Sequence, residues 1–111
     1  MDLFVTRAAT IAHDVEAADS SRAFRSAVKD FEHLLTRVTQ YPSDFLTVAD
    51  ADALAAIAGI VVSRIQERLD AQADRGRVQL ELARQIEQVR RDVDRIYVVQ
   101  RAGEPAATAL V

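Results

Sequence analysis

The stretch Ala53-Leu-Ala-Ala-Ile-Ala-Gly-Ile-Val-Val62 contains no charged side chain and no side chain that forms hydrogen bonds. Apolar residues recur along it at steps of four and three, as at Leu54, Ala58 and Val61, which is the spacing of one face of an α-helix. Apolar residues also occupy the other faces, and a helix that is apolar all round is buried. The stretch therefore predicts the central helix of a bundle, extending over about residues 48–73.

Charged residues close to both ends of this run argue against a membrane span. A span needs about 20 consecutive apolar residues, whereas Asp50 and Asp52 precede the run and Arg64 and Glu67 follow it. The N-terminal residues also lack the basic start and the apolar stretch of a signal peptide. The sequence therefore predicts no membrane segment and a cytoplasmic location.

The composition is that of a single globular domain. The chain has 111 residues, of which 50% are apolar and 28% are charged, and disordered chains have fewer apolar residues than this. It has no cysteine, so disulfides and thiolate chemistry are excluded. The net charge of -3 gives no general attraction to nucleic acid or to anionic lipid. We expect one helical domain over residues 1–101 and a C-terminal tail over residues 102–111.

Two amphipathic helices are expected before the central one. The first, over residues 3–18, has an apolar seam at Phe4, Ala8, Ile11, Val15 and Ala18. The second, over residues 21–40, has its own seam at Phe24, Val28, Phe31, Leu35 and Val38. Serine side chains favour helix N-termini, so Ser20 or Ser21 is the expected N-cap of the second helix. A single bent helix is the alternative.

The segment after the second helix carries a stop signal and then a start signal. Pro42 ends the helix because proline has no backbone N–H and restricts the residue before it. Phe45 and Leu46 are expected to fold back over the end of the core. Thr47, with Asp50 three residues later, resembles a capping box and starts the central helix at the next residue.

The last helix is expected over residues 78–101, and its apolar seam keeps the register of the central helix. One continuous helix from about 48 to 101 is therefore geometrically possible. It would, however, place four polar residues in succession in an apolar seam, at Arg68, Gln72, Arg75 and Gln79. A hairpin that reverses at residues 74–77 avoids this, and Gly76 at its centre is a natural C′ residue for the helix before it.

The sequence therefore predicts an all-α fold, an antiparallel up-down bundle of about four helices. Two short helices plus one long continuous helix are the alternative.

Two histidines have carboxylates three residues away, which is the ligand spacing of some di-metal helical bundles. His13 is paired in this way with Glu16, and His33 with Asp30. Each histidine points about 200° away from its own apolar seam at 100° per residue, and therefore toward solvent. We predict no metal site and no cofactor. We also predict no catalytic residues, because the sequence has no phosphate-binding glycine loop and no recognisable nucleophile motif.

Four arginines lie along one face of the last expected helix: Arg77, Arg84, Arg91 and Arg95. Such a stripe can bind phosphates or an acidic partner. Three acidic residues are interleaved with it, at Glu81, Glu87 and Asp94. Glu87 stands four residues before Arg91, which is a favourable orientation for an ion pair on a helix. We interpret the stripe as a self-neutralised solvent face, so nucleic acid is not an expected partner.

The outer stripe of the central helix, at Ala55, Gly59 and Val62, is apolar where an isolated bundle needs polar residues. Glycine inside a helix costs about 1 kcal/mol relative to alanine, so Gly59 favours close backbone approach. The stripe therefore predicts a homodimer, since two-fold closure is the commonest assembly. Coverage of this face by other segments of the same chain is the alternative.

The leading functional hypothesis is a non-enzymatic interaction protein. It would self-associate and present a helical surface to a protein partner, as an adaptor, a chaperone-like protein or an assembly subunit. The alternative is a small helical regulator that acts on nucleic acid, directly or through a DNA-binding partner. A third hypothesis is an enzyme or a metal-binding bundle built around the two histidines.

Overall fold

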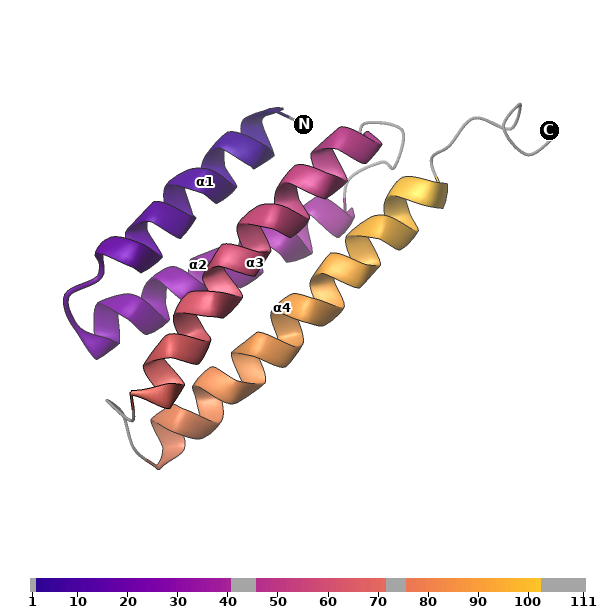
Figure 1. Ribbon diagram of the computed structural model, residues 1–111. Helices are drawn as coiled ribbons and strands as arrows, with labels where there is room; N and C mark the ends of the chain where they lie inside the picture. Colours follow the sequence, from indigo (N-terminus) through magenta and orange to yellow (C-terminus); the bar gives the residue numbers. More distant parts are fainter. Residues whose placement is uncertain (1, 41–45, 72–75, 103–111) are drawn as a thin grey trace, which may run out of the picture.

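The structure is a computed structural model that describes residues 2–40, 46–71 and 76–102. Within these ranges the chain forms four helices and no strand: α1 (Asp2–Ala17), α2 (Ser21–Gln40), α3 (Val48–Asp70) and α4 (Arg77–Ala102) (Figure 1). The all-α prediction is confirmed. The expected tail lies outside the described residues, apart from Ala102, which is the last residue of α4.

The two longest helices form the predicted hairpin. α3 ends at Asp70, α4 begins at Arg77, and the two pack side by side in opposite directions (Figure 1). The single long helix is therefore wrong. Gly76 has a positive φ of 59°, a conformation that glycine adopts without steric cost.

The role predicted for Gly76 needs correction. The C-cap of α3 is Ala71, whose N–H donates to the carbonyl of Glu67 at 3.0 Å. Gly76 lies directly before α4, and its carbonyl accepts a hydrogen bond from the N–H of Leu80 at 3.2 Å. Gly76 therefore starts the last helix and is not the C′ residue of the helix before it.

The four helices pack in the order α1, α2, α4, α3 around the bundle. Their directions alternate along the chain, so α1/α2 and α3/α4 are antiparallel, whereas α1/α3 and α2/α4 are parallel neighbours (Figure 1). In the simplest up-down bundle, consecutive helices are neighbours throughout. Here α2 and α3 occupy opposite corners. As a result, α4 packs against α2, and α3 lies between α1 and α4.

Local capping explains where α2 and α3 begin. The hydroxyl of Ser20 accepts a hydrogen bond from the N–H of Ala23 at 3.1 Å, so Ser20 is the N-cap of α2. The predicted capping box at α3 is confirmed. The Thr47 hydroxyl accepts from the N–H of Asp50 at 3.1 Å, and the Asp50 carboxylate accepts from the N–H of Thr47 at 3.1 Å. Both caps satisfy N–H groups that have no partner inside the helix.

The predicted apolar seams meet in one core. Its largest fully buried side chains include Phe31, Leu35, Leu54, Ile65, Leu82 and Ile96. The side chains that α1 contributes to the core are Ala8, Ile11, Ala12 and Val15. Leu46 is buried, as expected, whereas Phe45 lies outside the described residues. Among the helices that the structure describes, none is long and apolar enough to cross a membrane.

Candidate interaction surface

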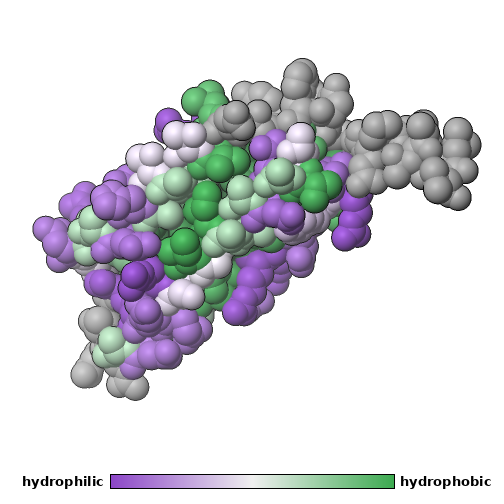
Figure 2. All heavy atoms as spheres, turned by 45° about the horizontal axis from the view of Figure 1, so that its top comes forward, coloured by the Kyte–Doolittle hydropathy of each residue, from purple (hydrophilic) through white to green (hydrophobic). Residues whose placement is uncertain are grey.

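The outward-facing side of α3 is apolar over its middle turns. Eleven consecutive residues, 53–63, carry no charge. Ala56, Gly59, Ile60 and the polar Ser63 are exposed among them, and we call the three residues Ala56, Gly59 and Ile60 the outer α3 face. Ile60 retains 45% of its accessible surface, which is a large exposed area for an aliphatic residue in mid-helix. In the space-filling view, apolar residues gather in a band across the middle of the molecule (Figure 2).

Of the three residues predicted for self-association, only Gly59 is exposed. Ala55 and Val62 are half-buried, and they line a groove of about 470 Å³ with Val89 and Val93 of α4. The predicted stripe therefore lies on the flank of α3 that adjoins α4. Besides Leu54 and Val61, the buried side of α3 includes the fully buried Ala51, which turns that side toward this flank.

Among the residues that the structure describes, none packs closely against the position of a Gly59 side chain. A Cβ atom added to Gly59 would have no heavy atom of a neighbouring group within 4 Å. Alanine would therefore fit, and glycine costs about 1 kcal/mol relative to alanine in a helix interior. The bundle alone gives no reason for glycine here, and the space beside it is open to another backbone.

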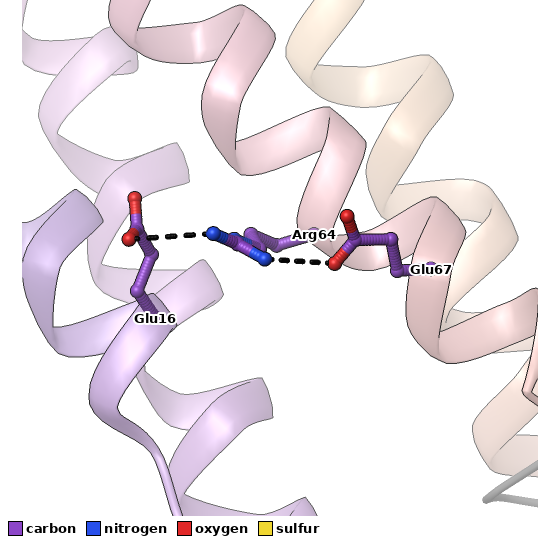
Figure 3. A network of polar contacts seen from close by, with 3 residues as sticks. All are labelled: Glu16, Arg64 and Glu67. Carbon is purple, nitrogen blue, oxygen red and sulfur yellow. Dashed lines mark hydrogen bonds and ion pairs between the residues drawn. The ribbon is translucent and has the colours of Figure 1, made fainter.

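A polar network borders the outer α3 face near the C-terminal end of α3. Arg64 donates to Glu67 of the same helix at 2.9 Å and to Glu16 of α1 at 3.5 Å (Figure 3). The hydrogen bond and the charge of Glu67, followed by the charge of Glu16, raise the pKa of the Arg64 guanidinium. The network joins α1 to α3, and its one arginine and two glutamates together carry a net charge of -1.

A carboxylate borders the same face nearer the N-terminal end of α3. The hydroxyl of Tyr97 on α4 donates to the carboxylate of Asp52 at 2.5 Å. This hydrogen bond to Asp52, together with burial and the carboxylate charge, raises the pKa of the Tyr97 phenol. The outer α3 face is thus bounded by Asp52 at one end and by the paired Arg64, Glu16 and Glu67 at the other.

The four arginines of α4 are all exposed, but the acids between them are arranged differently from the prediction. Glu81 turns toward α2, where it pairs with Arg25 at 3.2 Å and Lys29 at 3.8 Å. Glu87 pairs with Arg90 at 3.4 Å, so the expected Glu87–Arg91 pair is wrong. Glu81 turns toward α2 because α2 packs beside α4 and carries the bases Arg25 and Lys29. Fewer acids therefore neutralise the four arginines of α4 than the sequence indicates.

Both histidines are exposed, as their angular positions predicted. Among the residues that the structure describes, no three His, Cys, Asp or Glu side chains are grouped so as to hold a metal ion.

The sequence prediction missed a polar layer between α2 and α4. Gln85 and Asp92 retain only 5% and 2% of their accessible surface. One oxygen of Asp92 accepts from the amide of Gln88 at 3.0 Å. The other oxygen of Asp92, both polar atoms of Gln85 and one oxygen of Glu32 have no hydrogen-bond partner among the described residues.

Burial raises the pKa of both carboxyl groups in this polar layer, and the charge of Asp92 raises the pKa of Glu32 further. The seven-residue spacing of Gln85 and Asp92 was the available signal, because residues seven apart lie on the same side of a helix. They flank the apolar seam, and only the packing of α2 against that flank buries them.

Comparison with known protein families, with curated protein sequences and with solved structures finds no match to this chain.

Proposed function

We propose that this protein is a non-enzymatic helical interaction protein, which self-associates and presents a helical surface to a protein partner. One observation carries the proposal: the outer α3 face combines an exposed Ile60 with a glycine that no packing among the described residues requires. Exposed apolar patches on a small bundle are typical of sites that bind other proteins.

The energetics favour coverage of this face by a protein. Complete burial of an isoleucine side chain contributes about 1.5 to 3 kcal/mol relative to full exposure, and Ile60 still has 45% of its surface to bury. Gly59 lets a partner backbone come close, which increases the number of van der Waals contacts per turn. Nucleic acid would need bases at this surface, but residues 53–63 carry no charge.

Site-specific photocrosslinking tests this proposal. A benzoylphenylalanine at Ala56 places the reactive group on the outer α3 face, and one at exposed Ser26 of α2 serves as the control. We expect Ala56 to crosslink to a protein, either a second copy or another chain, and Ser26 not to do so. Absence of a protein crosslink from Ala56, both in cells and at tens of micromolar purified protein, would contradict the proposal.

A regulator that acts on nucleic acid is the second candidate. It is favoured by the position of Glu81, which pairs with α2 and leaves Arg77, Arg84, Arg91 and Arg95 exposed along α4. Phosphate contacts weaken steeply with salt. If this candidate is correct, a gel shift should be present at low salt, weaken at moderate salt, and be reduced further by Arg84→Glu with Arg91→Glu.

A further inference from the structure

We propose that the cavity between α2 and α4 binds a small α-amino acid, with its ammonium group at Glu32 and its carboxylate at Arg84. The cavity has a volume of about 200 Å³, and its lining residues are Lys29, Glu32, Glu81, Arg84, Gln85 and Gln88. The outer α3 face lies elsewhere, because α2 and α3 occupy opposite corners of the bundle. This binding site is therefore independent of the proposed function.

Gln85 is the residue that points to a ligand. It retains only 5% of its accessible surface, yet neither its amide oxygen nor its amide nitrogen has a hydrogen-bond partner among the described residues. Buried polar groups in proteins are nearly always hydrogen-bonded. The cavity beside Gln85 is several times larger than the roughly 10 to 15 Å³ that one water needs. It therefore has room for a larger molecule that both donates and accepts hydrogen bonds.

Glu32 supplies an acceptor in the same cavity. One of its carboxylate oxygens is buried and has no partner among the described residues. Burial and then the charge of Asp92 raise the pKa of Glu32, although His33 and Lys29 act in the opposite direction. The nearby bases therefore compensate its negative charge only in part. An ammonium group of a ligand would add positive charge and three N–H donors, which suit Glu32 and the amide oxygen of Gln85 together.

The bases of the lining argue against a ligand that is only a cation. Lys29 and Arg84 line the cavity with Glu32 and Glu81, so the two positive and two negative charges sum to zero. Glu81 already pairs with Lys29 at 3.8 Å. Arg84 is exposed and forms no ion pair with another described residue. A ligand that carries one charge of each sign complements this lining, with its carboxylate accepting from the Arg84 guanidinium.

The amide of Gln85 also limits the distance between the two charged groups of the ligand. Its oxygen can accept from the ammonium group, and its NH₂ can donate to the carboxylate. The oxygen and nitrogen of an amide share one carbon, so both groups of the ligand must lie close together. In an α-amino acid the ammonium and carboxylate groups are attached to the same carbon. The site therefore favours an α-amino acid over a ligand whose charges are far apart.

Nuclear magnetic resonance of the Gln85 side-chain amide tests this site, and the loss of its signals in Gln85→Leu assigns them. The test ligands are glycine, L-alanine and L-serine, each at up to about 10 mM, which is ten times a millimolar dissociation constant. Acetate and methylamine carry only one of the two charged groups and serve as controls. We expect at least one amino acid to shift the Gln85 amide signals saturably, and both controls to bind at least about tenfold more weakly.

Three variants test the roles of the lining residues. Gln85→Leu keeps the size of the side chain and removes both polar atoms, so we expect it to stay folded and to bind at least about tenfold more weakly. Arg84→Gln changes an exposed residue and should weaken binding at least about threefold. Arg90→Gln, exposed on the same helix but outside the cavity, should have no effect. Circular dichroism and backbone amide shifts would report folding and binding in every variant.

The assignment is overturned if none of the three amino acids shifts the Gln85 amide, since water alone then fills the cavity. Methylamine or acetate that binds as tightly as the amino acids would also overturn it, because one charged group would then be sufficient. Unchanged affinity in both Gln85→Leu and Arg84→Gln would place the ligand outside this cavity. None of these outcomes affects the photocrosslinking result expected at Ala56.

Discussion

Asp92 and Glu32 are the two carboxyl groups of the polar layer between α2 and α4. Burial raises the pKa of each carboxyl group above its ordinary value. The folded state therefore binds protons more readily than the unfolded state. The contribution of these groups to stability grows as pH falls through their raised folded-state pKa values, and it is complete below the unfolded-state values. It is lost as pH rises through the folded-state pKa values.

We therefore expect Asp92→Asn and Glu32→Gln to raise the free energy of unfolding at pH 7. Asparagine keeps the oxygen that accepts from Gln88 and removes the buried charge. Urea denaturation at about pH 7 and about pH 5 provides the measurement, with the exposed Glu87→Gln as the control. The gain should shrink at the lower pH, where the wild-type carboxyl groups take up protons. An equal gain at both pH values would show that ionisation of this layer is not the cause.

The apolar seams make a second prediction at the residue scale. Leu35 is fully buried, so Leu35→Ala should cost about 2 to 5 kcal/mol of the free energy of unfolding. His13 is exposed, so His13→Ala should cost less than about 0.5 kcal/mol. Guanidinium denaturation of both variants checks the assignment. A loss in the histidine variant as large as in the leucine variant would contradict it.

For single elements, the local rules of helix formation were sufficient to predict much of the structure. The capping box of Thr47 and Asp50 predicted the start of α3, because both hydrogen bonds depend only on residues three apart. The role of Gly76 could not be assigned in the same way. A glycine with positive φ can follow one helix or precede the next, and the sequence alone does not distinguish the two.

Gly59 provides a prediction at the element scale. Gly59→Ala places a methyl group in open space and removes the flexibility of glycine from a helix interior. We expect the monomer to become more stable by about 0.5 to 1 kcal/mol. The dimer should dissociate more readily, because the methyl group holds the two backbones apart. Thermal unfolding at low concentration and sedimentation at high concentration separate these effects. A variant that is stabilised without any loss of association would place the interface elsewhere.

At the scale of the whole molecule, the sequence predicted which residues face inward but not which helices are neighbours. The spacing of Leu54, Val61 and Ile65 defines a buried side of α3, yet any neighbour can cover that side. The order of the bundle depends on contacts between helices far apart in the chain, such as Arg25 of α2 with Glu81 of α4. The polar layer and the exact outward direction of α3 follow from that order, so they could not be predicted either.

The most direct test of the interaction surface is the molecular mass of wild type and Ile60→Arg in solution. Light scattering at tens of micromolar should give a dimer for wild type and a monomer for Ile60→Arg, with the same helix content. Val62→Arg should weaken the dimer less, because Val62 is half-buried beside α4. An Ile60→Arg variant that dimerises as tightly as wild type would contradict the assignment of the outer α3 face as the interface.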